Sequence, residues 1–172
     1  DLLEIIGNSD DPTKIQKHLR KMFAGISSLI MDQNNTVVNG IASREGEIVM
    51  LRRPVVIEQN QSINVWLTNV EKGVQESLAY IVKDAITDLT SVYDREPSID
   101  ESAFVSWVTK YPAQLVVLAS QVVWTSAVEK SLRSGTPSLS QVKSKVKGIL
   151  DILAGGVLLD HHAGERKKFE HL

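Results

Sequence analysis

The stretch SINVWLTNVEKGVQESLAYIVKDAITDLTSVY, residues 62–93, decides the fold. It contains no proline, and its apolar residues recur at steps of three and four, which places them on one face of an α-helix. These residues are Trp66, Val70, Val74, Leu78, Ile81, Ala85, Leu89 and Val92. The pattern predicts one helix of about 32 residues. Gly73 is expected to be its softest interior point, because glycine has a low helix propensity.

On the N-terminal side of this helix, residues 26–57 change to a period of two. The runs are SSLIM, TVVNGIAS and EIVML, which are aliphatic or β-branched and are separated by turn-forming residues. They predict a small antiparallel meander, with its second turn at Ser43–Gly46 rather than at Asn39-Gly40, because the former leaves longer strands. Pro54 lacks a backbone donor, so residues 55–57 should lie at an edge or leave the sheet.

A shorter amphipathic helix is expected before the meander, starting at Asp11-Pro12. Its apolar face carries Ile15, Leu19, Met22 and Phe23. Its polar face carries Lys14, Lys17, His18 and Lys21, a row that is more typical of a solvated surface than of a site for an acidic partner.

Three further helices are expected after Pro97. Ser98 and Glu101 have the spacing of a capping box and should begin a helix that buries Phe104, Trp107 and Val108. After Pro112 the chain is apolar around nearly the whole helical circumference, which predicts a central helix. Thr136-Pro137 should start the last helix, which Gly155-Gly156 could kink.

The three tryptophans, Trp66, Trp107 and Trp124, all lie within apolar periodicity. They are expected to be buried core anchors rather than a ligand cage.

The composition describes a water-soluble chain with one good core. Its 172 residues include 42% hydrophobic residues, a net charge of -2 and no cysteine. This balance argues against a nucleic-acid binder and excludes disulfides and thiolate metal sites. No apolar stretch reaches the roughly 20 residues of a membrane-spanning helix. Because the chain lacks an initiator methionine, we expect it to be excised from a longer protein.

Motifs for catalysis are missing from the sequence. There is no Gly-Lys pair for a phosphate-binding loop, no G-x-S-x-G and no H-E-x-x-H. Asp160, His161, His162 and His171 form the only histidine cluster, and adjacent helical histidines point about 100° apart. The basic run Arg166-Lys167-Lys168 is expected to be solvated. We therefore predict no catalytic, cofactor-binding or metal-binding residue.

Several segments together resemble the linker region of dynein heavy chains, in a form closest to cytoplasmic dynein. They are DLLEIIGNS (1–9), QKHLRKMFAGI (16–26), SREGEIVM (43–50), INVWLTNVEK (63–72), WVTKYPAQLVVLASQVVWT (107–125) and KKFEHL (167–172). None is a catalytic signature, but all six occur in the same order and span most of the chain.

The resemblance implies that residues 1–172 are a fragment of the dynein linker. It would be mainly α-helical, an elongated bundle with a small antiparallel meander, divided into residues 1–58 with short helices and the meander, and residues 59–172 with the long-helix bundle. In this family the linker is a non-catalytic arm that moves across the AAA+ ring during the ATP cycle and drives minus-end-directed movement on microtubules.

The resemblance also implies the partners. The fragment itself would hold no cofactor, because ATP and magnesium belong to the ring of the parent chain. Its contacts would be intramolecular, with the ring and the rest of the linker, whereas microtubules, a second heavy chain and accessory chains would bind elsewhere on a cytoplasmic, microtubule-associated motor. Neither nucleic acid nor membrane is expected as a partner.

Two other classes of function stay open at this point. One is a helical adaptor that docks a separate protein through the basic face at 14–21 or the hairpin region at 44–58. The other, weaker candidate is an enzyme with an unrecognised site, which a deep pocket with convergent polar groups would support.

Overall fold

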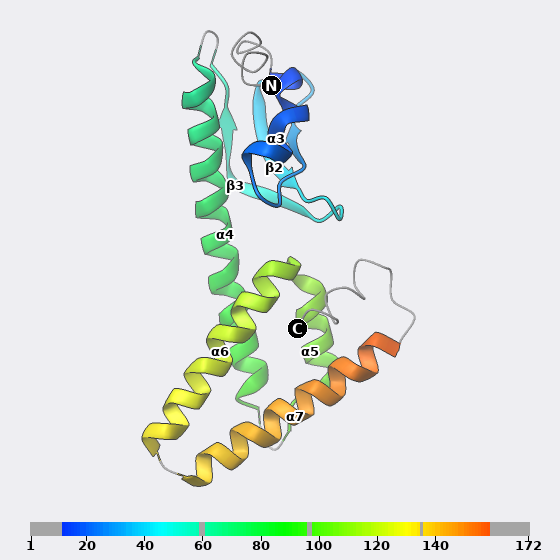
Figure 1. The fold of residues 1–172 in the computed structure, drawn as a ribbon, viewed down its shortest axis with the longest axis vertical. Coiled ribbons are helices and arrows are strands. Elements are labelled where there is room, and N and C mark those ends of the chain that lie inside the picture. Colours follow the sequence, from blue (N-terminus) through cyan, green and yellow to red (C-terminus); the bar gives the residue numbers. More distant parts are fainter. Residues whose placement is uncertain (1–11, 59–60, 96–97, 135, 159–172) are drawn as a thin grey trace. The chain divides into compact units, whose positions relative to one another are not determined.

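The computed structural model describes residues 12–58, 61–95, 98–134 and 136–158. The chain divides into two packing units, residues 1–79 and 80–172, and the division lies inside the long helix. The first unit holds a small sheet and the start of the long helix, and the second holds the rest of that helix and three more (Figure 1). Within the described residues the fold is mainly α-helical, as predicted.

The first described elements form a helical run that changes its winding. It consists of α2 (Pro12–Ile15), a 3₁₀ turn η1 (Gln16–His18) and α3 (Leu19–Met22). Ile15 and Leu19 are buried and the lysines are exposed, as predicted, but His18 is buried rather than on the polar face. The 3₁₀ turn explains the difference, because three residues per turn rotate the side chains further than a regular α-helix does.

The predicted meander is confirmed as a three-stranded antiparallel sheet in the order β1 (Ser28–Met31), β2 (Val37–Ala42) and β3 (Ile48–Val56). The second turn lies at Ser43–Gly46, where the Gly46 N–H donates to the Ser43 carbonyl at 3.2 Å. Gly46 has φ +88, a conformation that glycine adopts without strain.

The two edge strands of the sheet each have a distinguishing feature: β3 has a shift in register, and the edge of β1 is bonded to a side chain. In β3, Val55 and Val56 pair with β2 after a shift in register that accommodates Pro54, so this segment lies at the sheet edge, as predicted. At the opposite edge the side-chain amide of Gln16 bonds to both backbone groups of Leu29 in β1, at 3.0 and 3.2 Å. A covered edge cannot pair with another strand.

The backbone of β3 lies very close to Gly40 of β2. A Cβ atom there would lie 2.8 Å from the carbonyl oxygen of Val49, closer than real contacts allow.

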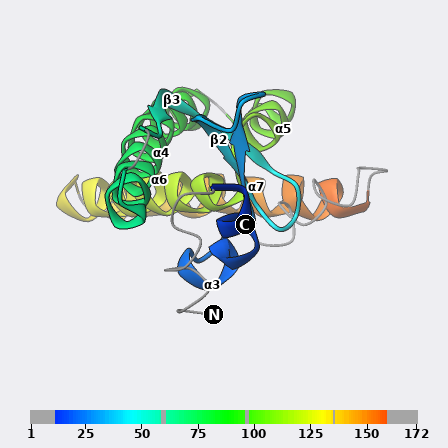
Figure 2. The same ribbon diagram turned by 90° about the horizontal axis from the view of Figure 1, so that it is seen from above.

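Figures 1 and 2 show the α2–α3 run against one face of the sheet and the first half of α4 beside β3. Trp66 and Val70 of α4 are among the buried core residues of the first unit.

The long helix is confirmed as α4 (Ile63–Tyr93), 31 residues without interruption. Its buried positions fall in two groups, ending at Ser77 in the first unit and resuming at Ala85 in the second. None of residues 78–84 is buried, and Leu78, expected in the core, is only half-buried. The two packing units therefore divide inside one helix, because each buries a different part of it.

The second unit adds α5 (Glu101–Lys110), α6 (Ala113–Ser134) and α7 (Thr136–Leu158). Its core joins these helices to the last three turns of α4 through Leu89, Phe104, Trp107, Val116 and Leu153, among others. The starts of α6 after Pro112 and of α7 at Thr136 agree with prediction, and α7 continues through Gly155-Gly156.

The N-cap of α5 differs from the predicted capping box. The cap is Asp100, whose carboxylate accepts from the Ala103 N–H at 2.9 Å, so Ser98 lies outside the helix. Aspartate is as good a capping residue as serine, and Asp100 stands at the right distance from the open amides of the first turn.

Candidate functional surfaces

In the first unit α4 is bonded directly to the edge strand β3. The Ser77 hydroxyl accepts from the backbone N–H of Arg52 at 2.9 Å and donates to the Gly73 carbonyl at 2.6 Å. A Cβ atom at Gly73 would lie 3.2 Å from a methyl carbon of Val55. Gly73 therefore has a packing role, because its missing side chain lets the strand approach the helix.

In the second unit α4 is bonded to α5 and to the residue that follows it. The indole N–H of Trp107 donates to the Ala85 carbonyl at 2.9 Å in the buried core. The Asp88 carboxylate accepts from the Lys110 ammonium at 2.7 Å and from the Tyr111 hydroxyl at 2.6 Å. These hydrogen bonds, that of Lys110 first, hold the pKa of Asp88 below its ordinary value.

The second unit exposes large apolar side chains, which the sequence did not predict. Trp124 on α6 is 51% exposed, so its expected burial is wrong, whereas Trp66 and Trp107 are buried at 1% and 3%. Leu118 on α6 and Leu150 on α7 are exposed as well. The described helices cover one face of α6, so α6 is not the central helix that its all-round apolar pattern predicted.

An apolar groove of about 320 Å³ lies between α6 and α7. Trp124 and Leu150 line it, and Leu89 and Phe104 contribute from the core. Apolar surface of this kind typically marks a contact with another protein segment.

The two surfaces proposed for an adaptor have different character. Lys14, Lys17 and Lys21 are exposed on the α2–α3 run, in agreement with a solvated basic face. In β3, Ile48 and Met50 are exposed at 62% and 56%, so one side of the hairpin region is apolar. Of the two, the β3 surface is the better suited to a protein contact.

Chemistry-bearing clusters are sparse. Among the described residues no three histidine or acidic side chains are placed to share a metal ion. The cluster Asp160, His161, His162 and His171 and the run 166–168 lie outside the described residues. None of the helices in the described part of the chain is long and apolar enough to cross a membrane.

Comparisons with known proteins all point to the same family. Residues 1–85 match the family described as "Dynein heavy chain, N-terminal region 2". The chain is 42% identical to the cytoplasmic dynein heavy chain of Dictyostelium discoideum and 40% identical to that of Drosophila melanogaster, in both cases over 100% of its length. It is 32% identical to cytoplasmic dynein 2 heavy chain 1 of Rattus norvegicus over 88% of its length.

The chain spans only 4% of the length of the first two relatives and 3% of the third. The similarity nevertheless covers both packing units, including the long helix and the meander. The chain therefore belongs to the dynein heavy chain family.

Proposed function

We propose that this chain is a non-catalytic part of the linker arm of a dynein motor heavy chain. In this role it transmits force while the arm moves across the AAA+ ring during the ATP cycle, and so drives minus-end-directed movement on microtubules. ATP and magnesium are bound by the ring of the parent chain. The working location is the cytoplasm, on microtubules.

The observation that carries this proposal is that α4 is held by hydrogen bonds and buried side chains in each of the two packing units. In the first unit it is bonded to β3 through Ser77, and in the second to α5 through Ala85 and Asp88. A continuous helix held by buried contacts in both units can carry a load from one to the other. Among the described residues, those that hold α4 do so by packing and hydrogen bonding, which is the role expected of residues in an element that transmits force.

The exposed apolar side chains fit the same proposal. Trp124, Leu118 and Leu150 would be covered by neighbouring parts of the heavy chain, either the rest of the linker or the ring. Burying such side chains stabilises a contact by about 25 cal/mol for each Å² of apolar surface removed from water. The parts of the heavy chain that cover these side chains would be the intramolecular partners of the fragment.

The test is made in the full-length motor with Leu89→Ala, because Leu89 is buried in the core that α4 shares with α5. We expect slower microtubule gliding with a smaller fall in basal ATPase, since the change loosens the arm and leaves the nucleotide site alone. Lys143→Ala, at an exposed position on α7, is the matched control and should leave both unchanged. Gliding and basal ATPase falling in equal proportion would refute the lever role.

The second candidate is a helical adaptor with no motor role, which the exposed apolar surface also favours. Trp124→Ser separates the two candidates in the full-length motor. If Trp124 belongs to the arm, gliding of the purified motor changes. If it docks a separate protein, the purified motor glides normally and only the recovery of a bound partner is lost.

A further inference from the structure

The C-terminal end of α4 lacks the residues that usually complete a helix end. The last carbonyls of a helix have no partner within it, and the helix dipole makes this end negative. The last turn of α4 contains no basic residue, and no glycine follows it to form a C-cap. Asp94 and Arg95, which come next, carry opposite charges that offset each other. A positively charged donor for this end therefore has to come from another element.

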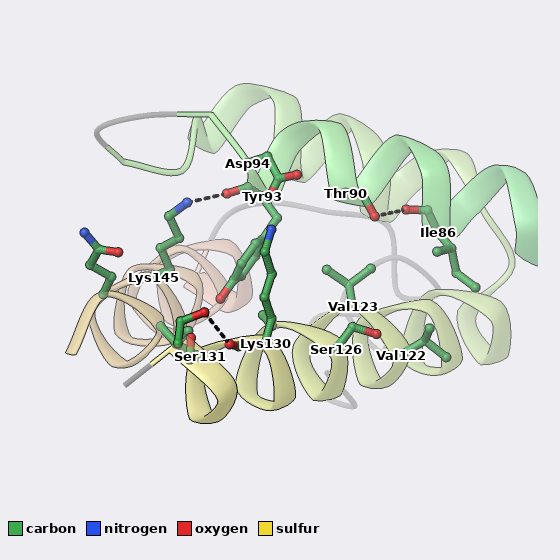
Figure 3. A pocket seen from close by; sticks show the side chains of 14 residues that line it. Ile86, Thr90, Tyr93, Asp94, Val122, Val123, Ser126, Lys130, Ser131 and Lys145 are labelled. Atoms are coloured by element: carbon green, nitrogen blue, oxygen red, sulfur yellow. Dashed lines mark hydrogen bonds between the residues drawn. The ribbon is translucent and has the colours of Figure 1, made fainter. Parts of the chain in front are cut away.

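Lys145 of α7 is that donor. Its ammonium donates to the Tyr93 carbonyl at 2.8 Å, a partly buried hydrogen bond at the last residue of α4 (Figure 3). The same ammonium lies 5.0 Å from the centre of the Tyr93 ring, a cation–π distance. A lysine at this place satisfies a helix carbonyl and also opposes the negative end of the dipole. Two contacts to one residue fix the position of the ammonium.

The Lys145 side chain connects two helices. α7 packs along α6, and α4, α6 and α7 together surround a pocket of about 330 Å³ that Lys145 lines. In Figure 3 the side chain extends from α7 to the end of α4. Lys145 is half-buried, so water screens its contacts less than it screens a surface ion pair. Because the acceptor is a main-chain carbonyl, the bond holds the helix itself rather than a side chain.

We propose that Lys145 is the positioning residue through which load passes from the end of α4 to α7. The inference rests on the proposed function, in which α4 carries load between the two units. With Lys145 in place, the last turn of α4 stays helical and moves with α7. Without it, the last turn frays and takes up displacement that would otherwise reach α7, because helix ends open at low cost in free energy.

The first test is hydrogen exchange in the full 172-residue chain carrying Lys145→Met, which keeps an unbranched apolar stem but removes the charge and the donor. The amides of residues 91–94, in and just after the last turn of α4, should exchange about tenfold faster than in the wild type. Amides near Ala85, in the core part of the same helix, should exchange at the wild-type rate.

Two further variants separate capping from a loss of packing. Lys145→Arg keeps a permanent charge and N–H donors, so it should restore slow exchange at residues 91–94. Lys143→Met, at an exposed position on the same helix, is the matched control and should exchange like the wild type throughout. A general loss of packing would instead speed exchange across the whole second unit.

The second test is made in the full-length motor. Lys145→Met should slow microtubule gliding more than it lowers basal ATPase, and Lys145→Arg should restore gliding. The inference is overturned by wild-type exchange at residues 91–94, by equal acceleration across the second unit or by failure of the arginine variant to restore slow exchange. It is also overturned if Lys145→Met glides normally while Leu89→Ala slows gliding. That last outcome leaves the proposed function standing, so the two failures are distinguishable.

Discussion

Two buried tryptophans give the sharpest test of the packing described above. Trp66 and Trp107 are almost equally buried, at 1% and 3% exposure. The Trp107 indole N–H donates to the Ala85 carbonyl at 2.9 Å, whereas the Trp66 indole N–H has no partner among the described residues. Replacing each by phenylalanine removes a similar volume from a core but has opposite effects on hydrogen bonding.

The magnitudes follow from that difference. Either substitution leaves a small cavity, which costs about 1–3 kcal/mol of the free energy of unfolding. Trp107→Phe also loses a net hydrogen bond of about 1 kcal/mol. Trp66→Phe removes a buried donor that is unsatisfied, which returns about 1–3 kcal/mol. Trp66→Phe should therefore be milder than Trp107→Phe by about 2 kcal/mol or more.

The assay is urea unfolding of each variant, followed by far-ultraviolet circular dichroism. With a slope of about 2 kcal/mol per molar urea, the fall in unfolding midpoint relative to wild type should be about 1 M larger for Trp107→Phe than for Trp66→Phe. Because the tryptophans lie in different units, each shift is taken from the transition of its own unit. Trp124→Phe is the control and should shift the midpoint little, since this side chain is half-exposed. A shift for Trp66→Phe equal to that for Trp107→Phe, or larger, would refute the reasoning.

Three further predictions concern single positions. Asp88→Asn should cost at most about 1 kcal/mol at pH 7 because the site is partly exposed. Folding lowers the pKa of Asp88 from its ordinary 3.8. The wild type should therefore be more stable to urea than Asp88→Asn at pH values above 3.8, and this difference in stability should vanish as the pH falls through the pKa of the folded state. Gln16→Ala should speed hydrogen exchange of the Leu29 amide and promote association detectable by light scattering, because it uncovers the edge of β1; unchanged exchange would contradict that role. Gly40→Ala should lower the melting temperature, because its Cβ would lie 2.8 Å from a carbonyl of β3, whereas Gly148→Ala, with open space around it, should raise stability by about 0.5–1 kcal/mol. Equal shifts for the two glycine variants would count against the close approach at Gly40.

The elements with a clear sequence period were predictable. The three-and-four spacing of residues 62–93 predicts α4, and the period of two in 26–57 predicts the meander. Both patterns are visible in the sequence because a helix and a strand each place their apolar residues on one face at a fixed spacing. The turn at Ser43–Gly46 followed from strand length, and the edge position of residues 55–57 followed from Pro54. The dynein family was also within reach of the sequence, since six segments in fixed order carry it.

Other features depended on which faces find a neighbour in space. Periodicity predicted burial for both Trp107 and Trp124. Only Trp107 is buried, whereas Trp124 is 51% exposed because the described elements cover one face of α6. His18 became buried through a 3₁₀ turn that the residue pattern does not signal.

The surroundings of Tyr93 are likewise a product of tertiary packing. Lys145 of α7, 52 residues further along the chain, donates to the Tyr93 carbonyl at 2.8 Å. A sequence determines the hydrophobicity of each face of a helix, whereas the packing of the helices decides which of those faces are covered and which polar groups are buried together.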